Sequence, residues 1–201
     1  MAKIKHTKNE LKAQRDALRR FKRYLPTLQL KKQQLQMEMR RLEQRIDEVR
    51  EEEDRLMSSI APWIRLFALP VDLASMVVLK EVRTTIGNIA GVNIPVLQGI
   101  EFEPVEIDLH ATDPWIDDAR AAIEQRIRLQ IEREILAEQH RLLGEELRIT
   151  TQRVNLFEKV KIPEAQANIR IIRIFLGDQQ TAEVARAKIA KSKTAAAEAM
   201  P

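Results

Sequence analysis

Histidine is rare and cysteine is absent in this sequence, and the side chains that could carry catalysis are not spaced as a site. The three histidines, His6, His110 and His140, are widely separated, and none has a second ligand at the spacing of a metal site. Neighbouring acids such as Glu51 and Glu52 point in different directions on a helix, so they do not form an acid–base pair. There is no cysteine to act as a nucleophile or a metal ligand. We therefore expect no catalytic centre and no metal site.

Cofactor-binding and membrane-spanning signals are also missing from the sequence. The five glycines form neither a P-loop nor a dinucleotide fingerprint, so no cofactor is expected. The amino terminus is basic, but no apolar segment follows it as in a secretory signal. The longest weakly charged stretch, residues 66–79, contains Pro70 and Asp72 and is shorter than the roughly 20 residues of a membrane span. The sequence predicts a soluble protein that is not an enzyme and has no direct membrane insertion.

The composition favours an elongated helical protein. Charged residues make up 32% of the 201 residues and aromatic residues only 4%. This balance is typical of chains whose surface is large relative to their core. Hydrophobic residues still make up 44%, which is enough to offset the conformational entropy lost on folding.

A heptad pattern runs from Leu11 to Ile60 and predicts a coiled-coil helix. Twelve of its fifteen a and d positions are apolar, and the exceptions are Gln14, Lys32 and Glu53. The a and d residues are Leu11, Gln14, Leu18, Phe21, Leu25, Leu28, Lys32, Leu35, Met39, Leu42, Ile46, Val49, Glu53, Leu56 and Ile60.

A second long helix is predicted after residue 112. Thr112 or Asp113 can cap its first turn, Pro114 suits the first helical position, and Asp117 and Asp118 face the positive end of the helix dipole. Apolar residues then recur at helical spacing as far as residue 176. Neither long helix would be stable with its apolar stripe exposed, so we expect the two to pair.

The segment between the two helices has a different composition. Residues 61–114 hold five of the eight prolines and three of the five glycines. A short helix is predicted over residues 70–85. Residues 92–97 and 100–103 are predicted to form two short strands joined by a tight turn at Gln98 and Gly99.

These elements predict an all-α fold: a long antiparallel two-helix coiled coil with a short central insert that contains a small helix and a β-hairpin. The expected divisions are a coiled-coil helix at 1–60, the insert at 61–112, a second coiled-coil helix at 113–193 and a frayed tail at 194–201. If Ile60 faces the start of the second helix, residues whose numbers sum to roughly 175 lie opposite one another.

This pairing makes specific contacts testable. It places Glu53 near Arg120 or Arg126, and Lys32 near Glu145 or Glu146. It also places the amino terminus near Ile174, so that residues 177–201 have no helix to pair with.

Charge is segregated along the chain. Residues 1–32 hold eleven Lys/Arg against two acids, residues 33–158 hold fifteen against twenty-four, and residues 159–201 hold eight against four. Paired termini would therefore form a basic tip. A basic helical tip could bind RNA, but Phe21 and Tyr24 are the only aromatic residues near it in the amino-terminal region and no base-reading motif is present.

Several segments resemble the family of D subunits of V-type and A-type ATPases. The run Arg153-Val154-Asn155-Leu156-Phe157-Glu158-Lys159-Val160-Lys161-Ile162-Pro163 is similar to the family pattern R-V-N-A-L-E-x-x-x-I-P. Asn168-Ile169-Arg170-Ile171-Ile172 is similar to its N-T-I-R-Y-I, and Asn88-Ile89-Ala90-Gly91-Val92-Asn93-Ile94-Pro95 to its N-V-M-G-V-x-V-P. Thr7-Lys8-Asn9-Glu10-Leu11 and Leu30-Lys31-Lys32-Gln33-Gln34-Leu35 match its amino-terminal elements, in the family's order.

The chain also departs from the family pattern. Leu156 and Phe157 replace Ala-Leu, Gln33 and Gln34 replace Arg-Asp, and Pro26 and Gly177 lie inside expected helices. These departures indicate a divergent branch and leave the straightness of the helices open.

The resemblance implies a role as the central-stalk rotor subunit of a rotary ATPase or ATP synthase. In the family the paired terminal helices stand inside the catalytic hexamer of A and B subunits. The insert lies with the F subunit and the socket subunit on the proteolipid ring of the membrane. The protein would couple ATP hydrolysis or synthesis to ion translocation from a cytoplasmic position peripheral to the membrane, without nucleic acid.

Three groups of residues are candidates for these contacts. The hexamer-contact candidates are Lys3, Lys5, Lys8, Lys12, Arg186, Lys188, Lys191 and Lys193. The family motif contributes Arg153, Asn155, Glu158, Ile162 and Pro163, and the insert hairpin contributes Gly91, Val92, Ile94 and Pro95. The alternative from another class is a coiled-coil export chaperone or stalk of a secretion-system ATPase, which would not need the Gly-Val-Asn-Ile-Pro segment. An RNA-binding helical arm is a further alternative.

Overall fold

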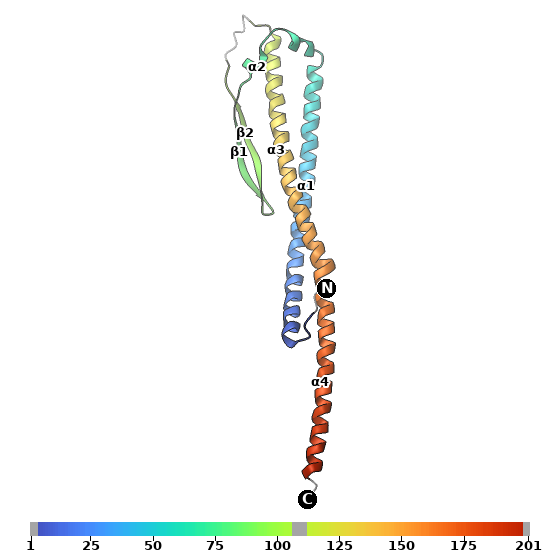
Figure 1. Ribbon diagram of the computed structural model, residues 1–201. Helices are drawn as coiled ribbons and strands as arrows, with labels where there is room; N and C mark the ends of the chain where they lie inside the picture. The colour runs from blue at the N-terminus through green and yellow to red at the C-terminus, as the bar shows by residue number, and fades with distance from the viewer. Residues whose placement is uncertain (1–3, 106–111, 199–201) are drawn as a thin grey trace. The chain divides into compact units, whose positions relative to one another are not determined.

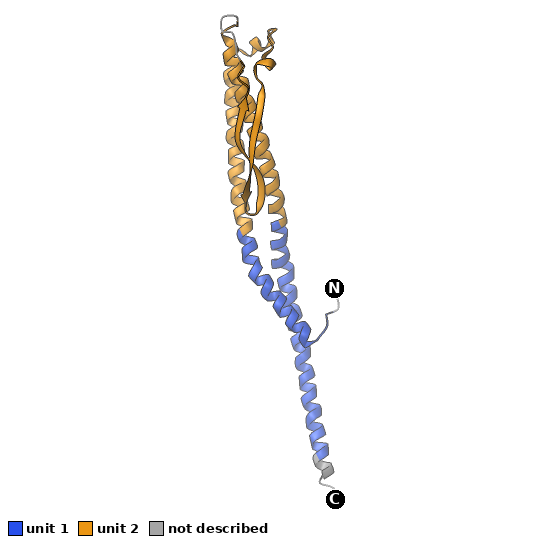
Figure 2. Ribbon diagram, turned by 90° about the vertical axis from the view of Figure 1, so that its left-hand side faces the viewer, with its two compact units in different colours: residues 1–30, 150–201 blue, residues 31–149 orange. Residues whose placement is uncertain are grey.

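The computed structural model describes residues 4–105 and 112–198, and for residues 195–198 it describes the backbone only. The chain divides into two compact units (Figure 2). Unit 1 consists of residues 1–30 and 150–201, and unit 2 of residues 31–149.

The described residues form two long helical segments with a β-hairpin between them in the sequence (Figure 1). The elements are α1 (Lys8–Ile60), the 3₁₀ helix η1 (Ile64–Ala68), α2 (Leu73–Met76), β1 (Leu79–Ile89), β2 (Val92–Phe102), α3 (Trp115–Leu156), the π-helical turn η2 (Phe157–Lys161) and α4 (Ile162–Glu198). The predicted fold class is confirmed: the protein is mostly helical, with two long helices packed antiparallel and a small hairpin insert.

In unit 2, α1 and α3 pair through their apolar heptad positions. Val49, Leu56 and Ile60 of α1 form one buried cluster with Ala122, Leu129 and Leu136 of α3. A second cluster joins Leu35, Leu143 and Ile94, and here both leucines are fully buried. Burying a side chain of this size stabilises a fold by about 1.5–3 kcal/mol. These clusters explain why the a and d pattern forms a helix pair.

Ion pairs between α1 and α3 confirm half of the predicted pairing of core charges. Arg126 Nη1 lies 2.5 Å from Glu53 Oε1, as expected for the buried glutamate at position a. The prediction for Lys32 stays a prediction: the ion pair found with Glu146 comes from the preceding residue, Lys31, whose Nζ lies 2.6 Å from the carboxylate. Lys31 occupies position g of the heptad, which flanks the apolar seam and is the usual source of interhelical salt bridges.

The insert differs from the sequence prediction in two ways. The predicted helix over 70–85 is only four residues long, capped by Asp72, whose side chain accepts a hydrogen bond from Ser75 N at 3.3 Å. From Leu79 onward the chain is β1, because its β-branched residues pair along their whole length with β2.

The predicted turn at Gln98 and Gly99 is also wrong. The hairpin turns at Ala90 and Gly91, whose φ angles of 50° and 80° suit a two-residue hairpin turn. Gln98 lies inside β2 as the extra residue of a β-bulge, between the pairs Arg83–Gly99 and Thr84–Leu97. A glycine after a polar residue therefore marked a bulge and not a turn.

In unit 1, the first part of α1 packs against η2 and α4. The ring of Phe21 lies 5.2 Å from that of Phe157, and the ring of His6 lies 4.8 Å from that of Phe175. Between these contacts, Asn168 Nδ2 donates a hydrogen bond to Gln14 Oε1 at 3.4 Å. The helices remain uninterrupted at Pro26 and Gly177, the two positions that left their straightness open.

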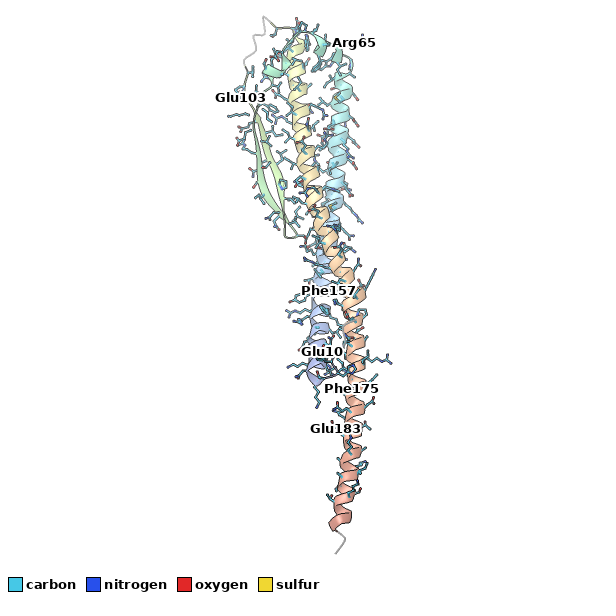
Figure 3. The ribbon with its side chains drawn as sticks, in the orientation of Figure 1. Glu10, Arg65, Glu103, Phe157, Phe175 and Glu183 are labelled. Carbon is cyan, nitrogen blue, oxygen red and sulfur yellow. The ribbon has the colours of Figure 1, made fainter. Side chains whose placement is uncertain are left out.

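The last part of α4 has no helical partner in unit 1. Beyond Phe175 the helix continues to Glu198, and no other described element of unit 1 runs beside it (Figures 1 and 3, where Glu183 marks this stretch). Val184 and Ile189 are 55% and 57% exposed. The predicted placement of the amino terminus near Ile174 falls on residues outside the described part and stays a prediction; within the described part, the ring of His6 contacts that of Phe175.

Candidate functional site

The described hexamer-contact candidates are exposed and fall into two groups in unit 1. Lys5 precedes α1, and Lys8 and Lys12 lie in its first turns. The second group lies on the unpaired part of α4, and its members are Arg186, Lys188, Lys191 and Lys193. About 16 Å of helix axis separates Phe175, which contacts His6, from Arg186. Lys3 lies outside the described residues.

The family motif lies at the junction of α3, η2 and α4. The backbone N–H of Ile162 donates to the carbonyl of Phe157, five residues earlier, so the helix is locally widened into a π turn. Pro163 follows at once and cannot donate a backbone hydrogen bond. Arg153, Asn155, Glu158 and Pro163 are exposed, and Ile162 is half-buried. The polar residues of the motif therefore face outward and not into the helix pair.

The insert hairpin residues have structural roles that the structure makes explicit. Gly91 adopts a φ of 80° that disfavours a side chain, and its N–H donates to Asn88 Oδ1 at 3.1 Å. Ile94 is 3% exposed in the cluster with Leu35 and Leu143, and Val92 packs against the same cluster. The carbonyl of Pro95 accepts a hydrogen bond from Gln139 Nε2 of α3 at 2.5 Å. These residues attach the hairpin to the helix pair of unit 2.

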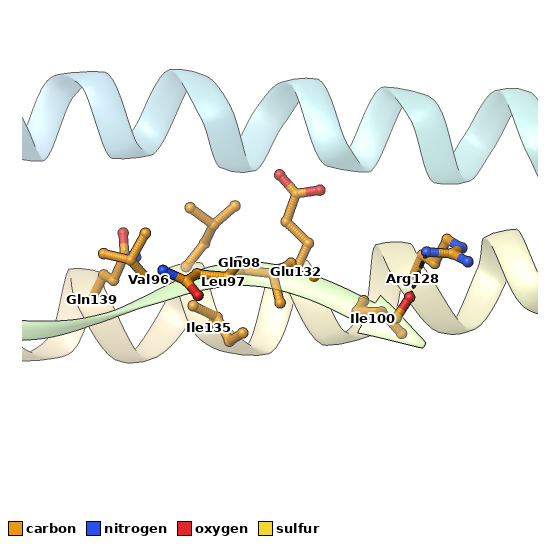
Figure 4. A pocket seen from close by; sticks show the side chains of 10 residues that line it. Val96, Leu97, Gln98, Ile100, Arg128, Glu132, Ile135 and Gln139 are labelled. Carbon is orange, nitrogen blue, oxygen red and sulfur yellow. Dashed lines mark hydrogen bonds between the residues drawn. The ribbon is translucent and has the colours of Figure 1, made fainter. Parts of the chain in front are cut away.

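A second attachment lies nearer the far end of β2. Arg128 donates to the carbonyl of Ile100 at 3.1 Å, and its guanidinium lies 4.8 Å from the centre of the Phe102 ring. Between the two attachments is a cavity of about 420 Å³. Figure 4 shows Val96 and Ile100 of β2 and Ile135 of α3 at its wall. The hairpin thus lies along α3 without filling the space between them.

The two units differ in how their charges are satisfied. Unit 2 carries sixteen Lys/Arg and twenty-three acids, and unit 1 carries eighteen and seven. Among the described residues of unit 2, nine arginines form ion pairs, namely Arg41, Arg45, Arg50, Arg55, Arg83, Arg120, Arg126, Arg133 and Arg141. Among the described residues of unit 1, the only ion pair joins Lys161 and Glu164.

The ion pairs of unit 2 also shift proton affinities. Hydrogen bonds to Glu48 and Glu132 raise the pKa of Arg45, which joins α1 to α3 through Glu132 at 2.7 Å. A hydrogen bond from Arg141 lowers the pKa of Glu138, and that same bond raises the pKa of Arg141. These shifts favour the charged forms of Arg45, Glu138 and Arg141.

A basic groove in unit 1 was missed by the sequence analysis. It has a volume of about 430 Å³ and is lined by Arg15, Leu18, Arg19 and Lys22 of α1 and by Gln166, Ile169 and Arg173 of α4. The spacing of Arg15, Arg19 and Lys22 at i, i+4 and i+7 is a signal for one helix face. That signal alone could not show that Arg173, far away in the sequence, completes the groove.

The described residues contain neither a membrane-spanning helix nor a cluster of metal ligands. None of the helices there is both long enough and apolar enough to cross a membrane. Nowhere in residues 4–105 and 112–198 do three His, Asp or Glu side chains gather closely enough to hold a metal ion.

Comparisons with known proteins agree with the motifs. The family model for the ATP synthase D subunit matches residues 10–192. The V-type ATP synthase D subunit from Borreliella burgdorferi is 50% identical over 192 residues, which cover 96% of this chain and 95% of the relative. The proteins of the same name from Chlamydia caviae and Chlamydia pneumoniae are 35% identical over 195 residues and 31% identical over 193 residues. The first match covers 96% of this chain and 94% of the Chlamydia caviae protein. The second covers 94% of this chain and 92% of the Chlamydia pneumoniae protein. The chain therefore belongs to the family of V-type ATP synthase D subunits.

Proposed function

We propose that the chain is the central-stalk rotor subunit of a V-type ATP synthase, without catalytic residues of its own. It couples ATP hydrolysis or synthesis in the hexamer of A and B subunits to ion translocation by the membrane ring. The observation that carries the proposal is that the chain belongs to the family of D subunits and that its long helices pair antiparallel. It works on the cytoplasmic side, peripheral to the membrane.

The pairing of the helices suits a part that transmits torque. A shaft must keep its two helices in register while it is twisted, because slippage would lose the mechanical coupling. In unit 2, Glu53 binds both Arg126 and Arg133, and Arg45 binds Glu132, so charges from both helices set the register. The apolar clusters beneath these pairs supply most of the cohesion.

The two units have different partners under this proposal. Unit 1, with its unpaired cations and the free part of α4, docks in the central passage of the A and B hexamer. Unit 2, which contains the hairpin insert, binds the F subunit and the socket subunit on the proteolipid ring. Residues 61–112 are the proposed insert, the segment that faces the ring. Residues 1–60 and 113–193 are the proposed coiled-coil helices of the shaft.

Removal of residues 177–201 tests this assignment. The truncated chain should keep its binding to the F subunit, because it retains all of unit 2. Its docking into the A and B hexamer should weaken, and the remaining affinity should fall more steeply with salt. Affinities are measured for both partners at low and high salt. Unchanged docking into the hexamer, or loss of the F subunit instead, would contradict the assignment of unit 1 to the hexamer.

A further inference from the structure

We propose that the basic groove of unit 1 is a docking site for an acidic protein segment that also carries an apolar side chain. The groove is the one lined by Arg15, Arg19, Lys22 and Arg173 around Leu18 and Ile169. None of its four cations belongs to the set of residues assigned to the hexamer from the sequence.

The first support is uncompensated charge. The lining contains four cations and no acid, and none of these four forms an ion pair or hydrogen bond within the described residues. Like charges held close together repel one another and destabilise the folded chain. Unit 2 of the same chain pairs most of its arginines with neighbouring carboxylates. The groove therefore presents cations whose counter-charges must come from solvent ions or from a partner.

The second support is spacing. Arg15, Arg19 and Lys22 span about 10 Å of the axis of α1 and lie on one face. Arg173 stands on α4, across the groove from them. Carboxylates placed three, four or seven residues apart on a partner helix have a similar repeat, so several can meet these cations at once. A single small anion would engage only part of this row.

The third support is the chemistry of the floor. Ile169 is 8% exposed and Leu18 is half-buried, so the groove has an apolar base beneath its charged rim. A buried apolar anchor inside a polar rim is the usual anatomy of a protein interface. The lining contains no aromatic ring on which a base could stack, which disfavours a single-stranded nucleic acid.

The identity of the partner rests on the proposed function. If unit 1 docks in the A and B hexamer, the acidic segment belongs to the inner wall of that passage. The groove would then bind it through charge-assisted hydrogen bonds from guanidinium groups.

A pair of charge-matched variants tests the groove. Arg19→Gln with Arg173→Gln removes two cations from the rim, one from each helix. The control, Arg20→Gln with Arg23→Gln, removes two exposed cations of α1 that do not line the groove. All four side chains are exposed, so both variants should keep the helix content of the parent. Affinity for the A and B hexamer is measured with the F subunit bound.

We expect the groove variant to dock about fivefold to tenfold more weakly at low salt, and the control less than about twofold. High salt should remove most of the difference between them. Equal weakening of both variants would mean that only net charge matters and would overturn the proposal. So would unchanged docking of the groove variant.

A photo-reactive benzoylphenylalanine in place of Arg19 identifies the occupant in the assembled complex. A cross-link to an acid-rich peptide of the A or B subunit supports the proposal. A cross-link to nucleic acid, or to a peptide without acidic residues, overturns it. Normal docking of both variants would refute the groove while the rotor function stands. Failure of the unmodified chain to bind the hexamer would refute the rotor function itself.

Discussion

Unit 2 pairs most of its arginines with carboxylates, whereas in the described part of unit 1 a single cation, Lys161, forms an ion pair. In unit 2 the ion pairs lie beside apolar clusters and tie the two helices together. In unit 1 the described residues contain one ion pair, and α4 continues beyond Phe175, which contacts His6 ahead of α1. The difference suggests that unit 2 is stabilised mainly by its own contacts, and that unit 1 is built for contacts with other molecules.

The largest expected effect comes from the core of unit 2. Leu143→Ala should lower the free energy of unfolding by about 2–5 kcal/mol, because it leaves a cavity between α1, α3 and the hairpin. Val184→Ala on the free part of α4, where the side chain is 55% exposed, should change it by less than about 0.5 kcal/mol. Urea unfolding followed by circular dichroism measures both. Similar losses in the two variants would remove the distinction between the units.

The next effect concerns the charges. Glu53→Gln should destabilise the protein by about 1–2 kcal/mol, since Arg126 and Arg133 both lose their carboxylate partner at the helix interface. Arg19→Gln in unit 1 removes a cation that has no such partner, so the free energy of unfolding at low salt should not fall. A loss in Arg19→Gln as large as that in Glu53→Gln would show that unit 1 has internal charge partners after all.

Two glycines extend the comparison to the backbone. Gly91→Ala should lower the free energy of unfolding by about 1 kcal/mol, because Gly91 has a φ of 80° in the hairpin turn of unit 2, which strains a residue with a side chain. Gly177→Ala should raise the free energy of unfolding by about 0.5–1 kcal/mol, because Gly177 lies inside α4 and an added Cβ meets no atom within 4 Å. Thermal unfolding of both variants measures these shifts. Opposite signs are expected, and a loss in Gly177→Ala would mean that this part of α4 is not a simple exposed helix.

The smallest effect is that of Glu138 and Arg141 on the surface of unit 2. The hydrogen bond from Arg141 lowers the pKa of Glu138, so its contribution is present above the ordinary glutamate pKa and is lost as the pH falls through the lowered value. Glu138→Gln should therefore change the acid limb of the stability profile slightly and leave neutral pH almost unaffected. A large change in thermal midpoint at neutral pH would contradict this expectation.

The sequence predicted those parts of the fold that rest on periodic apolar spacing. The heptad pattern identified α1 and its core, and the acids after Pro114 marked the start of α3. The rise per residue, with Ile60 set opposite the start of the second helix, placed Glu53 near Arg120 or Arg126, and Arg126 is its partner. The ion pair between Lys31 and Glu146 was not predicted, because the rise fixes axial position but not the direction of a long lysine side chain.

The insert was harder to predict because its strand pairing is decided by contacts between distant residues. A run such as Leu79–Ile89 has no periodicity that separates a strand from a short helix until its partner is known. The turn was misplaced because Ala90 accepts a positive φ, which its residue type disfavours. The basic groove could not be predicted, because it needs the register between α1 and α4 to bring Arg173 beside Arg19.

The most direct test of the proposed rotor function is to observe rotation. The chain has no cysteine, so Ser58→Cys, at an exposed position of α1 in unit 2, gives a single site for a bead or fluorophore. The A and B hexamer is fixed to a surface with the labelled chain and the F subunit assembled on it, and ATP is added. We predict unidirectional stepping of the label that stops when ATP is removed. ATP hydrolysis by the same complexes with a stationary label would contradict the proposal that this chain turns in the hexamer.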